Sequence, residues 1–234
     1  MNDMGELPLS TLDQNQLRRD ILLGRNSLVW QRLATNSRVA ERVICTIGHR
    51  DIADFEFTEN DRVWVFSYSR CGHENKVLLQ RLKDARVAEI VYLSSSSARI
   101  AAKVSCYEYP RIKRQAELLV DAMPIGRVLT VGLIYESESE LPSGHNAATS
   151  INELAEFMLA PHWTANRTDL LRLVKRPFAS KFEQLFYRSY SFAMLATGNY
   201  PCMLRPVDLL LRALGMQWYG YVYLSNRAWI STIS

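Results

Sequence analysis

A tyrosine and a lysine stand four residues apart in the segment "YEYPRIKRQAELL" and have the chemistry of an acid–base pair. Residues at positions i and i+4 share one face of a helix, so Tyr109 and Lys113 would lie side by side. A nearby ammonium favours the phenolate and lowers the pKa of a tyrosine from its usual value of about 10. Tyr109 is therefore a candidate general acid or base near neutral pH. The alternative is an ordinary amphipathic helix that carries both residues by chance.

The elements around this pair alternate between strand-like and helix-like patterns. Five strand-like segments are expected. The first is a short apolar run at residues 20–24, and the others are strands at 42–48, 61–69, 88–97 and 126–135. Helical patterns are expected near 28–33, over 75–85 and over 109–123, where Pro110 suits the first turn. This alternation predicts an α/β fold, a Rossmann-like doubly wound parallel sheet with helices on both faces.

Polar clusters follow the predicted strands. They read "GRNS", "GHRD", "SYSRCG" and "SSSS" along the chain. In open parallel sheets ligands bind at the carboxyl ends of the strands, so these clusters are expected to gather around one site.

The character of the sequence changes near residue 150, where we predict the boundary between two domains. Residues 1–150 would form the dinucleotide-binding domain, and residues 151–234 a mostly helical substrate-binding or interface region. We expect a Ser- and Gly-rich loop over 137–150, a helix over 151–160 and mostly helical structure over 167–214. The helix over 151–160 would begin near Ser150 or Asn152. The aromatic-rich end, residues 215–230, is expected to form a strand or a strand-like tail.

Composition and charge exclude several classes of protein. The 234 residues are 48% hydrophobic and 22% charged, which is typical of a folded globular chain. No apolar run approaches the roughly 20 residues of a transmembrane helix, and the start lacks the pattern of a secretory signal. The four cysteines are scattered, without metal-ligand spacing, so we expect no metal and reduced thiols in a cytoplasmic protein.

The charge of the C-terminal part indicates an acidic partner. Residues 161–234 hold nine Lys or Arg against three Asp or Glu, an excess of six, while the whole chain carries +4. A phosphorylated substrate, a membrane surface or a nucleic acid would fit, and a solvated basic face is the alternative. Neither a zinc-finger spacing nor an RNA-binding aromatic pattern is present, so we do not expect nucleic acid.

Read in order, the serine cluster, the Tyr-Lys pair and the next strand resemble the short-chain dehydrogenase/reductase superfamily. The resemblance is to its extended branch of nucleotide-sugar epimerases, dehydratases and reductases, and it covers roughly residues 20–160. It rests on "IVYLSSSSA", "YPRIK" and "RVLTVGLIY", with further matches at Asn75, Glu117, Gly132 and Tyr135. It implies that Tyr109 is the acid–base residue, that Lys113 binds the nicotinamide ribose, and that a serine polarises the substrate. Ser96 matches that serine best, with Ser95 and Ser97 as alternatives.

The sequence departs from the family at the turn that approaches the cofactor. The family pattern GxxGxxG keeps only its first glycine here, Gly24, while Ser27 and Trp30 stand at the other two positions. Ser27 would cap the following helix, and Trp30 would force that helix outward. Arg25 and Arg50 favour the 2′-phosphate of NADP, with NAD or solvated loop charges as alternatives. The predicted cofactor-binding residues are Gly24, Arg25, Asn26, Ser27, His49, Arg50, Ser67 and Lys113.

The resemblance implies an NAD(P)-dependent oxidoreductase or epimerase acting on a sugar nucleotide or a similar hydroxyl or carbonyl substrate. Glycan or secondary-metabolite biosynthesis would be its setting. The family often dimerises through the tyrosine helix, so a homodimer is expected. The alternatives are a non-catalytic NADP-binding sensor or scaffold on the same fold, and a subunit of a glycan-assembly complex.

Overall fold

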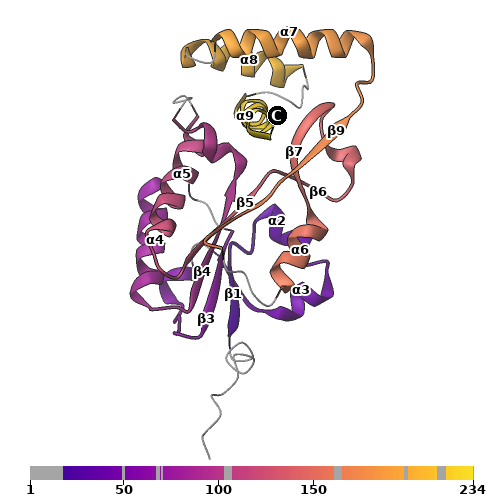
Figure 1. Cartoon of the computed structure of the whole chain (residues 1–234). Coiled ribbons are helices and arrows are strands. Elements are labelled where there is room, and N and C mark those ends of the chain that lie inside the picture. The colour runs from indigo at the N-terminus through magenta and orange to yellow at the C-terminus, as the bar shows by residue number, and fades with distance from the viewer. Residues whose placement is uncertain are drawn as a thin grey trace, which may run out of the picture.

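A six-stranded parallel sheet forms the centre of the molecule in a computed structural model (Figure 1). The structure describes residues 18–48, 51–66, 69, 71–102, 107–160, 165–197, 200–214 and 220–233. The strands in spatial order are β2 (Val43–Ile47), β1 (Arg19–Leu23), β3 (Asp61–Val65), β4 (Glu89–Ser95), β5 (Gly126–Val131) and β8 (Arg167–Leu170). All five strand pairs are parallel, which confirms the predicted Rossmann-like α/β fold.

Helices cover both faces of this sheet, as the alternating side chains of the strands require. Ile21 and Leu23 pack on one face beneath α4 (Gly72–Asp84) and α5 (Glu108–Asp121). Leu22 points to the opposite face, which is covered by α2 (Leu28–Leu33), α3 (Ser37–Arg42) and α6 (Ile151–Leu159). Successive residues of a strand point to opposite faces, so both faces must be covered by apolar side chains. The short helix α3 was not predicted from the sequence.

The strand order reverses next to β1, and such a reversal marks where sheets of this kind bind ligands. The chain runs from β1 to the outer strand β2 and then returns to β3 on the other side of β1. Between β2 and β3 the only regular element in the described residues is the single turn η1 (Asp51–Asp54). The carboxyl ends of β1 and β3 therefore flank the topological switch point.

A second, three-stranded sheet corrects two sequence predictions. It contains β6 (Leu133–Tyr135), β7 (Gly144–Ser150) and β9 (Arg172–Arg176), with β7 parallel to β6 and antiparallel to β9. The strand predicted over 126–135 divides into β5 and β6. The predicted loop over 137–150 and the helical pattern from residue 167 were wrong in part. Each of these strands is stabilised by partners distant in sequence, so no local pattern reveals them.

Gly132 divides β5 from β6 because the backbone of β7 passes directly against it. A Cβ atom at this position would lie 2.2 Å from the carbonyl oxygen of Ala147 and 2.6 Å from its carbonyl carbon. The Gly132 amide donates to the hydroxyl of Thr149 over 3.0 Å. A residue with a side chain would push the two sheets apart.

We expect Gly132→Ala to lower the free energy of unfolding by about 2 kcal/mol, the usual range for overpacking against a rigid neighbour. Urea denaturation would measure the loss as a lower midpoint. Gly72→Ala is the matched control, since its Cβ would meet only the flexible end of Gln115 at 3.3 Å and the side chain of Ile112 at 4.0 Å. Equal midpoints for the two variants would contradict the close approach at Gly132.

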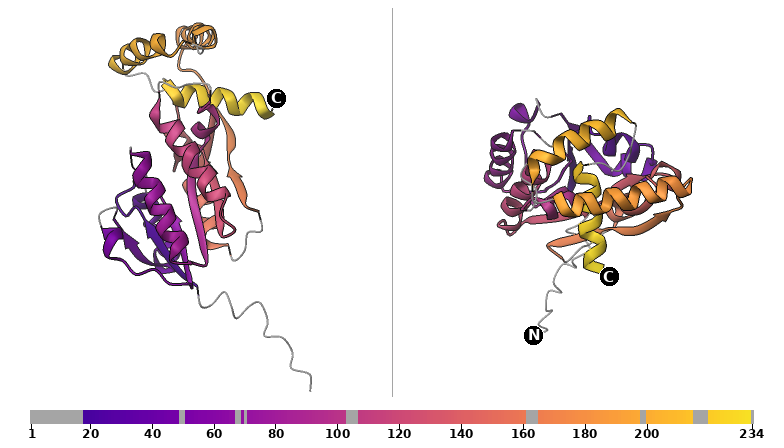
Figure 2. Two further views of the ribbon diagram at one scale, coloured as in Figure 1. Left: turned by 90° about the vertical axis from the view of Figure 1, so that its left-hand side faces the viewer. Right: turned by 90° about the horizontal axis from the view of Figure 1, so that it is seen from above.

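Three helices follow the strands and form a separate layer at one end of the molecule. They are α7 (Lys181–Thr197), α8 (Pro201–Ala213) and α9 (Gly220–Ile233). Figure 2 shows α7 and α8 outermost, with α9 between them and the rest of the chain. Two 3-10 turns, η2 (Ser96–Ile100) and η3 (Glu138–Glu140), complete the elements. Within the part of the chain that the structure describes, no helix combines the length and apolar character needed to cross a bilayer.

The strand-like tail predicted over 215–230 was wrong from residue 220 onward, because residues 220–233 form α9, and residues 215–219 lie outside the described part of the chain. Two of its aromatic residues contact other elements instead of lining a sheet. The Tyr223 ring contacts Tyr187 and Tyr190 of α7 at 5.7 and 4.9 Å between centroids, and the Arg99 guanidinium lies 4.6 Å from the Trp229 ring. After residue 150, α6 and β8 still belong to the layers of the parallel sheet. The domain boundary at residue 150 stays a prediction.

Candidate functional site

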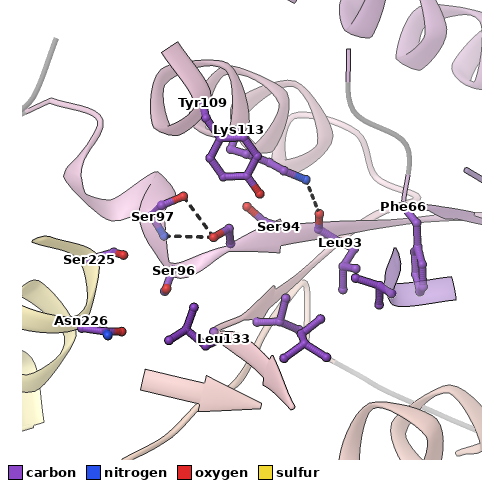
Figure 3. A pocket seen from close by; sticks show the side chains of 15 residues that line it. Phe66, Leu93, Ser94, Ser96, Ser97, Tyr109, Lys113, Leu133, Ser225 and Asn226 are labelled. Atoms are coloured by element: carbon purple, nitrogen blue, oxygen red, sulfur yellow. Dashed lines mark hydrogen bonds between the residues drawn. The ribbon is translucent and has the colours of Figure 1, made fainter. Parts of the chain in front are cut away.

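A cavity of about 330 Å³ lies where the carboxyl end of β4 meets α5 (Figure 3). Its polar lining comes from the serine cluster Ser94–Ser97, from Tyr109 and Lys113 of α5, and from Ser225 and Asn226 of α9. The rest of the wall is mainly apolar and is formed by Val29, Phe66, Leu93, Val131, Leu133 and Ile134, together with Gly132. A few convergent polar groups in an apolar cavity are typical of a ligand site.

The predicted acid–base pair lies on one face of a helix and faces this cavity. Helix α5 begins at Glu108, so Pro110 stands in its first turn as expected. Tyr109 is half-buried and Lys113 is 5% exposed. Figure 3 shows both side chains directed toward β4, and the Lys113 Nζ lies 5.9 Å from the centre of the Tyr109 ring. The structure therefore brings Tyr109, Lys113 and Ser96 to one cavity.

Lys113 is held by the end of β4. Its Nζ donates a hydrogen bond of 2.8 Å to the Leu93 carbonyl and lies 4.8 Å from the centre of the Tyr92 ring. Burial lowers the pKa of Lys113 to about 8, while the carboxylate of Glu117 acts in the opposite direction. The ammonium is thus buried, oriented and close to its titration range at neutral pH.

The hydroxyls of the four serines differ in their hydrogen bonds. The Ser95 hydroxyl caps η2 and accepts hydrogen bonds from the Ser97 amide and hydroxyl, at 3.3 and 3.0 Å. The Ser94 hydroxyl donates to Glu117 over 2.5 Å. Among the described residues, the hydroxyl of Ser96 forms no hydrogen bond, and Ser96 lines the cavity. Ser96 is therefore the serine whose hydroxyl is best placed to bind a ligand.

Glu117 connects the site to its surroundings. This buried carboxylate accepts from Ser94 at the end of β4 and from Arg114 over 2.7 Å, and it lies 3.3 Å from the guanidinium of Arg167 in β8. It thereby links α5 to two strands of the sheet and fixes the position of the helix that carries Tyr109 and Lys113. From the sequence Glu117 is only a match to the family pattern, without a visible partner.

Two residues of the site were missed by sequence reasoning. Ser225 and Asn226 of α9 are 4% and 5% exposed and line the cavity opposite α5 (Figure 3). The Asn226 side-chain oxygen accepts a hydrogen bond of 3.1 Å from the Ala147 amide, which attaches α9 to β7. No local pattern around "YLSNR" indicates this role, because it depends on how α9 packs.

The turn after β1 confirms the predicted helix cap at Ser27 and shows which group its backbone amides bind. Gly24 has a φ of +111°, which favours glycine, and the Ser27 hydroxyl caps α2 by accepting from the Trp30 amide over 3.1 Å. The amides of Gly24 and Arg25 both donate to the Ile47 carbonyl, at 2.8 and 3.3 Å. Trp30 is buried in the core beneath α2. The outward shift predicted for this helix stays a prediction.

The remaining predicted cofactor residues lie apart from the cavity or outside the described residues. The Arg25 guanidinium forms an ion pair of 2.9 Å with Asp51, in which both side chains are about half exposed. Gly24 to Ser27 do not line the cavity, although Val29 of the following helix does. The predictions for His49, Arg50 and Ser67 fall on residues outside those that the structure describes.

No family model matches the chain, and no curated protein matches it in sequence. Solved structures do match it. An NAD-dependent NDP-hexosamine 5,6-dehydratase, TunA, aligns with a TM-score of 0.50 at 9% identity over 66% of this chain and 76% of its own. MoeE5 in complex with UDP-glucuronic acid and NAD aligns with 0.49 at 14% identity, over 67% and 78% of the two chains.

A third match is the dTDP-glucose 4,6-dehydratase DesIV from Streptomyces venezuelae, with a TM-score of 0.49 at 11% identity over 74% of this chain and 81% of its own. At such low identity a structural likeness establishes the fold and leaves the chemistry to the residues of the site. The chain therefore has the Rossmann-like α/β fold of the NDP-hexosamine 5,6-dehydratase TunA, as its resemblance to extended short-chain dehydrogenase/reductases predicts.

Proposed function

We propose that this chain is an NAD(P)-dependent enzyme of the short-chain dehydrogenase/reductase type that acts on a sugar nucleotide or a similar hydroxyl or carbonyl substrate. Glycan or secondary-metabolite biosynthesis is its proposed setting. The observation that carries the proposal is the meeting of Tyr109, Lys113 and Ser96 in one cavity at the carboxyl end of a parallel sheet. TunA, a solved structure of similar fold, is described as an NAD-dependent NDP-hexosamine 5,6-dehydratase.

The residues of the cavity fit the nicotinamide-bearing half of a dinucleotide. Ligand pockets span about 300–1,000 Å³, and this one, at about 330 Å³, is at the lower end. Its floor carries the ammonium of Lys113, a donor suited to ribose hydroxyls, and its other wall is apolar. Gly24 to Ser27 would hold the phosphates. The nicotinamide, when bound, supplies the hydride acceptor or donor.

The chain's own groups would then perform three tasks. The Tyr109 hydroxyl would take or return the proton of the substrate hydroxyl, and the buried ammonium of Lys113 would favour the phenolate during that transfer. The Ser96 hydroxyl would donate a hydrogen bond to the same substrate oxygen. The apolar wall formed by Phe66, Leu133 and their neighbours would exclude water from the reacting centre.

Calorimetric titration of the purified protein with NADPH and NADH tests cofactor binding. We expect both to bind and NADPH to bind more tightly, because the half-exposed Arg25 guanidinium would exchange its ion pair with Asp51 for the 2′-phosphate. Arg25→Gln should weaken NADPH binding about tenfold, the effect of one charged hydrogen bond, and leave NADH binding unchanged. Absence of binding by either dinucleotide at millimolar concentration would overturn the proposal.

A non-catalytic cofactor-binding protein is the second candidate. Two observations favour it: only the first of three family glycines is present, and the Gly24 and Arg25 amides are already bound to the Ile47 carbonyl. Such a protein would bind a dinucleotide and turn over no substrate. Substitution of Tyr109 separates the two candidates.

A further inference from the structure

The outer faces of α7 and α8 expose many large apolar side chains. Phe192 is 77% exposed, Phe182 75% and Leu209 69%. The set also includes Leu185, Met203, Val207, Leu210 and Leu214. Monomeric proteins rarely leave a contiguous apolar patch of this kind in water, so these helices are expected to meet a further surface.

The apolar residues form continuous stripes on the two helices. On α8 and the residue after it, Met203, Val207, Leu210 and Leu214 follow the 4-3-4 spacing that keeps side chains on one face, and Leu209 widens that face. Leu211 lies on another side of the helix and is buried.

On α7, Phe182, Leu185 and Phe192 share the outer face. Tyr190 lies on the inner face and packs on Tyr223. Each helix therefore has one face in the protein and a second apolar face in solvent.

Positive charges border both stripes. Lys181 and Arg188 lie within four residues of Leu185, and Arg205 precedes Leu209 by four; all three cations are exposed. Residues 161–234 contain nine Lys or Arg and three Asp or Glu, an excess of six. An apolar face bordered by Lys and Arg is the pattern of a helix that lies in the interface of an anionic membrane.

We propose that α7 and α8 form a membrane-binding face, which lies in the plane of an anionic lipid bilayer with Phe182, Phe192 and Leu209 among the inserted side chains. Charge complementarity selects this partner. A second copy of the chain is disfavoured, because a two-fold symmetric contact would bring together two identical faces, each bordered by Lys181, Arg188 and Arg205. The two helices also lie at one end of the molecule, on the far side of α9 from the sheet (Figures 1 and 2).

Cosedimentation of the full chain with lipid vesicles tests the proposal. We expect binding to phosphatidylcholine vesicles that contain about 30% phosphatidylglycerol, and much weaker binding to phosphatidylcholine alone. Salt at about 1 M, where charges are screened beyond about 3 Å, should reduce the binding. Lys181→Gln with Arg188→Gln should weaken it about fivefold for each charge removed.

Leu209→Glu with Leu210→Glu is the decisive variant, since both side chains are exposed and the fold should persist. We expect its partition onto anionic vesicles to fall by at least about tenfold, in line with the transfer of leucine from water. Val77→Glu on α4 replaces another exposed apolar residue, 53% exposed and away from this face, and should bind like the wild type. Circular dichroism would verify that each variant is folded.

Three outcomes would overturn the proposal. The wild type would stay in solution with anionic vesicles, or the double leucine variant would bind as well as the wild type. In the third, the chain would self-associate in analytical ultracentrifugation, lose that association in the leucine variant, and show no vesicle binding. That result would assign the face to a second copy of the chain.

Discussion

Tyr109→Phe is expected to reduce turnover by about 10²–10⁴-fold, the usual contribution of a positioned general acid or base. The substitution removes the hydroxyl that faces the cavity and leaves the ring beside Lys113. Dinucleotide affinity should stay within about twofold, because the proposed cofactor contacts come from Lys113 and the turn at Gly24. The measurements are turnover of sugar nucleotides followed by chromatography, and calorimetric titration with NADPH.

Tyr200→Phe provides the matched control, since Tyr200 is exposed beside α8 and does not line the cavity. It should retain wild-type turnover. If Tyr109→Phe kept full turnover, Tyr109 would have no part in the chemistry. A protein that binds NADPH but shows no turnover of any sugar nucleotide, before or after the substitution, would be the non-catalytic candidate.

Lys113→Met is expected to abolish most activity and at the same time to stabilise the fold at pH 7. The Lys113 ammonium is buried, and its pKa falls from 10.5 to about 8, which corresponds to about 3 kcal/mol against the charged form. Methionine has a similar shape and no charge, while it loses the hydrogen bond to Leu93, worth about 1 kcal/mol. The net gain at pH 7 should be about 2 kcal/mol.

The pH dependence of this stability gain tests whether the buried charge of Lys113 is its cause. Below pH 8 Lys113 is protonated in both the folded and the unfolded chain, so the full cost of burying the charge is present. Between about pH 8 and 10.5 the unfolded chain binds more protons, and the wild type gains stability as the pH rises. The advantage of Lys113→Met should therefore shrink by pH 10.

Denaturant titrations at pH 7 and pH 10 measure this advantage. Lys83→Met, at an exposed position of α4, serves as the control. A variant less stable than the wild type at both pH values would show that Lys113 is a structural residue and not one that is retained at a cost to stability.

The sequence predicts β1, β3, β4 and β5 of the parallel sheet well because these strands are buried on both faces. It misses β8, whose side chains are exposed or half-buried. Such strands as the first four appear as short β-branched runs, as in "RVWV" and "EIVYL", and local caps such as Ser27 and Ser150 mark where helices begin. The second sheet was missed because β7 is half polar and depends on β6 and β9, which are distant partners. The helix α9 was missed because its aromatic residues favour strands in isolation.

The candidate site also contains some residues that the sequence predicts and others that only the structure reveals. Tyr109 and Lys113 are adjacent on one helix, so their spacing alone predicts their proximity. The low pKa of Lys113 depends on its burial between α5 and β4, which spacing does not show. Ser225 and Asn226 reach the cavity from more than 100 residues along the chain, through the packing of α9 on η2 and β7. Their participation could be seen only in the folded molecule.

Strand β2, which lies at the edge of the parallel sheet beyond β1, affects how the protein behaves at high concentration. Among the described residues β2 ends the sheet, so one side of its backbone has donors and acceptors that no strand pairs. Its sequence, "VICTI", is β-branched and uncharged, and Ile44 is 58% exposed. Such an edge is a template for strand addition by another chain. Concentrated preparations are therefore expected to aggregate through β2, and the substitution Ile44→Lys should block this contact.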